Sequence, residues 1–249
     1  MRVTAIIPTF CDDESLDCLL SRLTGLPERP EEILVVDGNA SAQTAALCQQ
    51  RGALWLTARA SRGAQLAYGA ARARGDVLWF VHADATPSAH AARCLRIAVE
   101  GGAAGGYFRF LFSGEPTLTK RLLQWCIRWR CRSSMVYGDQ GIFVARDVYA
   151  ASPGFAIQPL FEEVALVRAL RRTRRFVALS EPIVVDARRW ERDGYWRRTL
   201  ANRVLAMLFA AGFSPARLAR WYASSSLARR RSGRVQRTPQ RRAGGEGPG

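Results

Sequence analysis

Val77-Leu78-Trp79-Phe80-Val81-His82-Ala83-Asp84 is the stretch that decides the fold. Its first five residues are apolar, which is typical of a strand buried on both faces, and an aspartate follows shortly after them. Upstream, Ile33-Leu34-Val35-Val36 is followed in the same way by Asp37-Gly38. Ligands of open α/β sheets bind outside the carboxyl ends of the strands. We therefore expect Asp37 and Asp84 to face one crevice.

Short apolar runs alternate with helical patterns over the first hundred residues. The expected strands are 3–8, 33–36, 54–57 and 77–81, each followed by a helical pattern. Further strands are expected at 107–112, 142–145, 176–179 and 183–185, with helices at 116–131 and from about 161. Strand–helix alternation with short connections predicts an α/β fold with a doubly wound, mostly parallel, Rossmann-type sheet flanked by helices.

The two strand-end aspartates occur in a chain that has no glycine-rich phosphate loop. Mg²⁺ and Mn²⁺ are commonly held by one or two carboxylates together with the phosphates of the substrate. The sequence therefore predicts a divalent cation that helps to hold a diphosphate at these strand ends.

Composition limits the class of protein. The formal net charge is +16 over 249 residues, and Lys120 is the only lysine, so the positive charge is almost all arginine. This arginine content reflects either the codon usage of a GC-rich genome or attraction to phosphate groups. The six cysteines form no C-x-x-C pair, and with two histidines they give no zinc spacing. We expect a reducing, cytoplasmic location, without a signal peptide.

Seven motifs occur in a fixed order across roughly residues 1–195. They are Ile6-Ile7-Pro8-Thr9-Phe10, Val35-Val36-Asp37-Gly38 with Ser41, Arg62-Gly63, His82-Ala83-Asp84, Gly138-Asp139-Gln140, Glu162-Glu163 and Arg188-Arg189-Trp190. This ordered set resembles the family 2 glycosyltransferases of GT-A fold. The resemblance implies an inverting enzyme that moves a sugar from a nucleotide diphosphate, UDP by default, to an acceptor that the sequence does not identify.

The resemblance assigns the nucleotide-binding half of the site. Its residues are Pro8, Thr9, Phe10, Asp12, Asp37, Arg62, Gly63, His82 and Asp84. Three positions depart from the family pattern, because Cys11 replaces an Asn, Asp12 a Glu, and His82 the first Asp of the usual Asp-x-Asp. The resemblance leaves Asp84 as the expected metal ligand, and His82 as a second ligand, a ribose contact or a packed neighbour. Asp37 alternatively forms the turn before Gly38.

The same resemblance assigns the catalytic and acceptor side. Glu163 is the expected base and Glu162 its support; alternatively both acids favour a helix N-terminus electrostatically. The residues expected to contact the acceptor or the leaving diphosphate are Gly138, Asp139, Gln140, Arg188, Arg189 and Trp190. Trp190 is expected to stack on a sugar ring or a lipid. Asp186 replaces the Gln of the processive Gln-x-x-Arg-Trp signature, so we infer no polymer synthesis.

The expected organisation is a catalytic domain over 1–195, with a nucleotide-binding half (1–100) and an acceptor half (101–195). An amphipathic helical extension (196–223) and a basic disordered tail (224–249) follow. The extension either packs on the domain or lies in the plane of an anionic membrane surface, which would make the acceptor lipid-linked or membrane-proximal. The amphipathic stretch Leu118–Trp129 would then line its approach.

Two other functions fit parts of the sequence. Sugar-phosphate nucleotidyltransferases also use a Rossmann-like sheet and Mg²⁺, but they carry a glycine-rich loop where this chain has Pro8-Thr9-Phe10-Cys11-Asp12. A non-enzymatic, basic nucleic-acid-binding protein would explain the charge, but no recognition motif accompanies it.

Overall fold

The fold is an α/β structure built on one eight-stranded sheet, seen in a computed structural model that describes residues 1–173 and 175–222. The strands are β1 (Val3–Thr9), β2 (Glu32–Asp37), β3 (Leu54–Thr57), β4 (Val77–Phe80), β5 (Ala85–Pro87), β6 (Gly105–Phe112), β7 (Phe143–Ala145) and β8 (Phe176–Val185). The helices are α1 (Asp13–Thr24), α2 (Ala42–Gln50), α3 (Arg62–Arg72), α4 (Ala91–Glu100), α5 (Leu118–Ser133), α6 (Arg146–Ala150), α7 (Val164–Arg172), α8 (Arg188–Asp193) and α9 (Tyr195–Ala210), with a 3-10 turn, η1, at Gly138–Gln140. The tail expected to be disordered, 224–249, lies outside the described residues.

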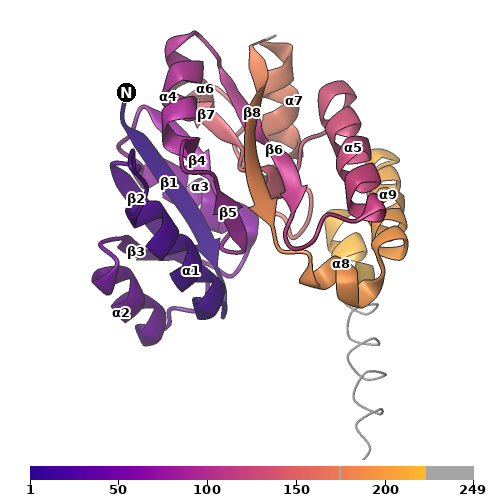
Figure 1. The fold of residues 1–249 in the computed structure, drawn as a ribbon, viewed down its shortest axis with the longest axis horizontal. Helices are drawn as coiled ribbons and strands as arrows, with labels where there is room; N and C mark the ends of the chain where they lie inside the picture. The colour runs from indigo at the N-terminus through magenta and orange to yellow at the C-terminus, as the bar shows by residue number, and fades with distance from the viewer. Residues whose placement is uncertain (174, 223–249) are drawn as a thin grey trace, which may run out of the picture.

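The strand order is β3-β2-β1-β4-β7-β6-β8-β5 (Figure 1). The first four strands pair in parallel, as expected from their alternation with helices, and β7 runs antiparallel to both β4 and β6. The two strands expected at 176–179 and 183–185 form one continuous strand, β8. Its pairing with β6 is irregular between Tyr107 and Arg109, opposite residues 180–182, which lie between the two expected strands. The expected doubly wound α/β fold is confirmed, and its sheet is mixed, with parallel β1–β4 and an antiparallel β7.

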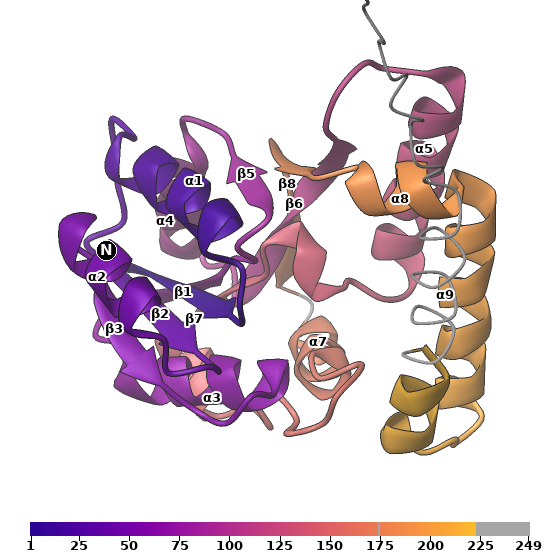
Figure 2. The ribbon, with the colours of Figure 1, turned by 90° about the horizontal axis from the view of Figure 1, so that it is seen from below.

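Helices cover both faces of the sheet, α1 and α4 on one side and α3 and α7 on the other (Figure 2). Successive residues of β1 point to opposite faces. Ala5 and Ile7 belong to the apolar cluster that includes Leu16 and Leu95, whereas Ile6 belongs to the cluster that includes Leu66. Because both faces of the central strands are buried, their sequences are continuous apolar runs.

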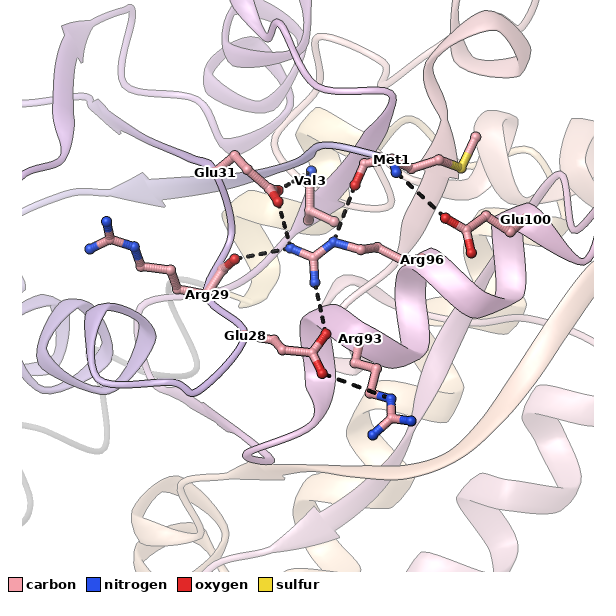
Figure 3. A network of polar contacts seen from close by, with 8 residues as sticks. All are labelled: Met1, Val3, Glu28, Arg29, Glu31, Arg93, Arg96 and Glu100. Atoms are coloured by element: carbon pink, nitrogen blue, oxygen red, sulfur yellow. Dashed lines mark hydrogen bonds and ion pairs between the residues drawn. The ribbon is translucent and has the colours of Figure 1, made fainter.

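A charged network closes the edge of the sheet at which β1 and β2 begin (Figure 3). Arg96 of α4 donates to Glu31 at 2.8 Å and to Glu28 at 3.3 Å, and Val3 N–H donates to Glu31 at 2.7 Å. A hollow of about 830 Å³ lies beside these residues and is lined in part by Arg51. The groups at this edge pair with one another, and the strand-end aspartates lie at the opposite edge.

A third apolar cluster joins the far end of the sheet to the C-terminal helices. Phe110, Phe112 and Leu123 form it with Val185, and Tyr195 of α9 packs against it. The start of α9 therefore packs on the domain, and packing on the domain was one of the two alternatives that the sequence left open for the C-terminal extension. Among the helices in the described ranges, none is long and apolar enough to span a bilayer.

Candidate active site

Three parallel strands bring the predicted nucleotide-binding residues to one edge of the sheet. Thr9 pairs with Asp37 across β1 and β2, and Val81 N–H donates to the Ile6 carbonyl at 3.0 Å where β4 ends. Gln65 of α3 joins two of the ends, because its Nε2 donates to the carbonyls of Thr9 and Val36 at 2.7 Å each. Hydrogen bonds from the first turn of α3 therefore hold the ends of β1 and β2 together.

Asp37 is fully buried and its carboxylate serves the turn that follows β2. It accepts hydrogen bonds from the N–H groups of Asn39 at 2.7 Å and Ser41 at 2.8 Å, and a longer one from Trp55 Nε1 at 3.4 Å. Ser41 in turn caps α2. The turn-forming role that the sequence left open is thus observed, and a direct contact between Asp37 and a nucleotide stays a prediction.

Backbone strain gathers around the predicted site. Among the described residues, the non-glycine residues with positive φ are Cys11 at 51°, Ala40 at 52° and Phe161 at 61°. Cys11 and Ala40 lie in the turns after β1 and β2, and Phe161 directly precedes Glu162-Glu163. Such residues cost free energy and persist where the surrounding structure fixes them, often at functional sites.

Cys11→Asn is expected to raise the free energy of unfolding by about 0.5–1 kcal/mol, because asparagine tolerates the left-handed region better than cysteine does. Urea denaturation of the variant and the parent measures this change. Cys18→Asn, an exposed position inside α1, is the matched control and is expected to give no gain. An equal or lower stability of Cys11→Asn than of the parent would contradict the assignment of strain.

Four carboxylates come together beyond the strand ends: Asp84, Asp139, Glu162 and Glu163. Glu162 and Glu163 are each 5% exposed, and burial, reinforced by Glu162, raises the pKa of Glu163 to about 8. Burial also raises the pKa of Asp139; Arg130 opposes this shift and Asp84 adds to it. The sequence-predicted base, metal ligand and acceptor turn therefore lie within electrostatic reach of one another.

Arg62 and Gly63 connect the nucleotide-binding half to this cluster. Arg62 Nη1 lies 3.6 Å from Glu162 Oε1, so the guanidinium predicted to bind phosphate is paired with one of the acids. A Cβ on Gly63 would lie 2.0 Å from the Ala156 carbonyl oxygen and 3.1 Å from Glu162 Cβ. The N-terminus of α3 can approach the loop that carries the acids only because residue 63 is glycine.

Gly63→Ala is expected to lower the free energy of unfolding by about 2 kcal/mol or more, since a contact of this kind forces backbone to move. It should also displace Glu162. Thermal unfolding and an activity assay measure the two effects. Gly101→Ala, at the end of α4, is the control and should cost much less, because its Cβ would lie 3.2 Å from the Ile97 carbonyl oxygen, a contact that a small shift relieves. Equal behaviour of the two variants would refute the close approach.

The η1 turn contacts the end of β4. Gln140 is 1% exposed, and its Oε1 accepts from Tyr137 N–H at 3.2 Å, so it holds the turn rather than facing a ligand. A Cβ on Gly138 would lie 2.8 Å from His82 Nε2, which places the imidazole against the turn as a packed neighbour. Asp139 Oδ1 is buried, without a hydrogen-bond partner in the described part of the chain. Asp139 therefore lies in the η1 turn within electrostatic reach of Asp84, and its contact with a ligand stays a prediction.

An aromatic wall that the sequence did not predict borders the acids. The Tyr137 and Phe161 rings lie 6.2 Å apart, and Phe209 of α9 stacks on Phe161 at 4.6 Å. Arg130 lies over the Tyr137 ring at 4.5 Å. Tyr137 directly precedes the η1 turn and Phe161 directly precedes the acid pair, so their positions in the sequence could have identified them. No sequence pattern distinguishes Arg130 from the other arginines or connects Phe209 with the site.

In the Arg188-Arg189-Trp190 motif, Arg188 is exposed to solvent whereas Trp190 packs on the protein. Arg188 is exposed and pairs with Asp186, and it lies close enough to Glu14 and Asp12 for these acids to raise its pKa further. It thus faces the turn after β1. Trp190 packs on Phe112 at 5.2 Å, with Arg198 over its ring at 4.8 Å, so its stacking on a sugar or lipid is not observed and stays a prediction. The side chain of Arg189 lies outside the described part of the structure.

The acid cluster fits a divalent cation. Buried carboxylates close enough to raise one another's pKa, one of them with an unpartnered oxygen, form an environment that positive charge stabilises. No group of three or more His, Cys, Asp or Glu residues positioned to hold a metal occurs in residues 1–173 and 175–222. Asp84 is the residue that would share such a cation with the oxygens of a substrate, as carboxylates commonly do for Mg²⁺ and Mn²⁺.

The fold is an α/β sheet with acids gathered beyond the carboxyl ends of its parallel strands, and comparison with known sequences shows which family it belongs to. The profile described as Glycosyl transferase family 2 matches residues 4–149. The chain belongs to this family and is a glycosyltransferase. The match contains the three strand ends, Arg62-Gly63 and the η1 turn. No curated protein matches the sequence significantly.

Solved structures show the same GT-A fold. Glucosyl-3-phosphoglycerate synthase from Mycobacterium tuberculosis, in complex with Mn²⁺, UDP-glucose and glycerol 3-phosphate, aligns with a TM-score of 0.55 at 17% identity over 73% of this chain and 70% of its own. S. aureus TarS 1–349 with UDP-GlcNAc aligns with a TM-score of 0.59 at 13% identity over 75% and 58%. A mycobacterial protein aligns with a TM-score of 0.52 at 18% identity over 74% and 65%. The chain thus spans 58–70% of the length of these three.

Proposed function

We propose that this glycosyltransferase transfers a sugar, with inversion, from a nucleotide diphosphate sugar to an acceptor whose nucleophile is deprotonated by Glu163. The observation that carries the proposal is the buried acid cluster at the carboxyl ends of the strands, with Arg62 paired to Glu162. UDP is the donor nucleotide we expect, and the two structural neighbours solved with UDP-glucose and UDP-GlcNAc support this choice.

Glu163 is suited to act as a general base. A base works best when its pKa lies near the working pH, and burial brings the pKa of this carboxyl to about 8. Glu162 is held by Arg62, so it is the less available of the pair. An inverting displacement needs one base on the acceptor side. Glu163 would therefore remove the acceptor proton while the bond from the sugar to the diphosphate breaks.

Asp84 would hold the divalent cation, with Asp139 close enough for the charge of Asp84 to raise its pKa. When bound, such a cation stabilises the negative charge that develops on the departing diphosphate. Arg62, half-exposed at the N-terminus of α3, offers a guanidinium at the same edge, and helix N-termini favour anions. Thr9 Oγ1 is buried and lacks a partner in the described ranges, which leaves a hydroxyl for the nucleotide at the end of β1.

The acceptor would enter beside Tyr137, Phe161 and Phe209. These rings border Glu163 and provide apolar faces on which a sugar ring or another flat or apolar group can stack. Arg130, and Arg203 of α9, lie close enough to the Tyr137 hydroxyl to lower its pKa, against burial, which raises it. The site therefore offers an acceptor both aromatic surface and positive charge.

A donor screen tests the proposal. The protein is incubated with UDP-, GDP- and dTDP-sugars in the presence of Mn²⁺ or Mg²⁺, and release of nucleoside diphosphate is measured. Cation-dependent release from at least one nucleotide sugar is the expected result. Pyrophosphate exchange in place of diphosphate release would indicate a nucleotidyltransferase. Salt-dependent binding to random DNA, without binding of any nucleotide sugar, would indicate a nucleic-acid-binding protein.

A further inference from the structure

Helix α5 carries an exposed apolar stripe that the proposed function does not use. Leu118, Leu122, Trp125 and Trp129 recur at helical spacing, with exposed fractions of 83%, 47%, 62% and 65%. The two indole rings stack at 6.3 Å with an interplanar angle of 20°. The opposite side of the helix, represented by Leu123, is buried against β6. The stripe is therefore a surface that the described part of the domain leaves uncovered.

Positive charge follows the same side of the helix. Arg121, Arg128 and Arg132 are exposed and lie three or four residues from members of the stripe. The sequence of α5 contains no Asp or Glu. Its two remaining basic residues are turned towards the protein, since Lys120 donates to the Ser113 carbonyl and Arg130 donates to the Met135 carbonyl. The exposed face of α5 thus combines tryptophan and leucine with three arginines and no opposing charge.

We propose that the exposed face of α5 binds an anionic lipid bilayer, with Trp125 and Trp129 inserted at the level of the headgroups. Tryptophan is favoured at the membrane interface because its ring is apolar and its N–H is polar. Arginines beside an apolar stripe meet anionic headgroups while their apolar stems lie against the surface. Helix α5 lies at the same end of the molecule as α8 and α9, with α9 beside it in both views (Figures 1 and 2).

The sequence left two alternatives for the C-terminal helix, either packed on the domain or interfacial. In the structure Leu205 of α9 is buried, Phe209 stacks on Phe161, and Tyr195 packs on Phe112. α9 is therefore partly engaged with the domain. Its exposed residues Leu200 and Met207 provide a comparison for α5 in the test that follows.

Co-sedimentation of the full chain with phosphatidylcholine vesicles, prepared with and without phosphatidylglycerol, tests the proposal. Binding is expected only with phosphatidylglycerol and is expected to weaken as salt rises. The double variant Trp125→Ala/Trp129→Ala should reduce this binding about tenfold or more, because it removes the apolar anchor. The triple variant Arg121→Gln/Arg128→Gln/Arg132→Gln should reduce it about a hundredfold at low salt and flatten the salt dependence.

Two controls make the result specific. Leu54→Ala/Ile97→Ala removes side chains that are 54% and 56% exposed on β3 and α4, and it should leave vesicle binding unchanged. Leu200→Ala/Met207→Ala removes two exposed apolar side chains from α9 and should reduce vesicle binding less than the α5 variants do. The proposal is overturned if the parent does not prefer anionic vesicles, or if only the α9 variant loses binding. It is also overturned if the parent is a dimer that the tryptophan variant dissociates and neither binds vesicles, since α5 would then be an interface between two copies.

Discussion

Glu163→Gln is expected to lower kcat by about a hundredfold to ten-thousandfold, the range that a general base contributes. The affinity for the donor should change little, because a base acts in the transition state and not in donor binding. Glutamine has nearly the same shape, so the buried site should keep its packing. Steady-state kinetics with the donor identified by the screen, together with calorimetric titration of the nucleotide, measures the two quantities.

Glu162→Gln is the matched control for the assignment within the pair. It removes the partner of Arg62 and one of the charges that raise the pKa of Glu163, but it leaves the proposed base in place. We expect a smaller loss of kcat and a lower pH optimum. If Glu162→Gln is the more damaging change and Glu163→Gln is mild, the two roles are the reverse of those proposed.

The pKa of Glu163 adds a pH dependence with a defined sign. The base must lose its proton to work, so kcat/KM should rise with pH and level off above a pKa near 8. Stability should move in the opposite direction. The folded protein holds this proton up to about pH 8, whereas the unfolded chain releases it near the ordinary glutamate pKa of 4.5. The contribution of this group to the free energy of unfolding is therefore full below pH 4.5 and is lost as pH rises towards 8.

It follows that Glu163→Gln should be more stable than the parent at alkaline pH, by roughly 1–3 kcal/mol, even as it loses activity. Urea denaturation at about pH 6 and pH 9 measures the difference. An identical pH dependence of the parent and the variant would show that Glu163 is charged and solvated in the folded protein, and the catalytic argument would lose its basis.

The strand ends could be predicted from the sequence because each is a local feature. An apolar run such as 77–81 that is followed by an aspartate indicates a buried strand and the place where it ends. Parallel pairing of the strands then brings Thr9, Asp37 and Asp84 to one edge of the sheet. The order of the motifs predicted that the acids at 162–163 belong to the same site. The structure places them there, although which residues contact ligands stays a prediction.

The contacts that no local pattern encodes were not predicted. The approach of Gly63 to Ala156 joins residues far apart in the sequence, and so does the stacking of Phe209 on Phe161. The resemblance implies that Trp190 stacks on a sugar ring or a lipid, and the packing of its ring on Phe112 of β6 could not be predicted from the sequence. Two strands were expected at 176–179 and 183–185, yet β8 is continuous because irregular pairing with β6 accommodates Pro182.

Asp84→Asn is expected to reduce transfer by about a thousandfold or more, because a catalytic cation contributes several kcal/mol and each 1.36 kcal/mol is a factor of about ten. The exchange of one carboxylate oxygen for an amide keeps the size of the side chain while weakening it as a ligand for Mg²⁺ or Mn²⁺. Asp84 is half-buried at the end of β4, so the fold should be retained. The affinity for UDP should then be the same with and without Mn²⁺.

Asp76→Asn is the matched control, since Asp76 lies just before the same strand but at the opposite edge of the sheet, where it accepts from Arg2 N–H at 2.8 Å. Calorimetry of UDP binding with and without Mn²⁺ should show a normal cation dependence in Asp76→Asn and none in Asp84→Asn. Asp139→Asn locates the cation further. Because Asp84 raises the pKa of Asp139, a cation between them should bind more weakly in either variant. An unchanged cation dependence in Asp84→Asn, with a loss confined to Asp139→Asn, would move the cation from the end of β4 to the η1 turn.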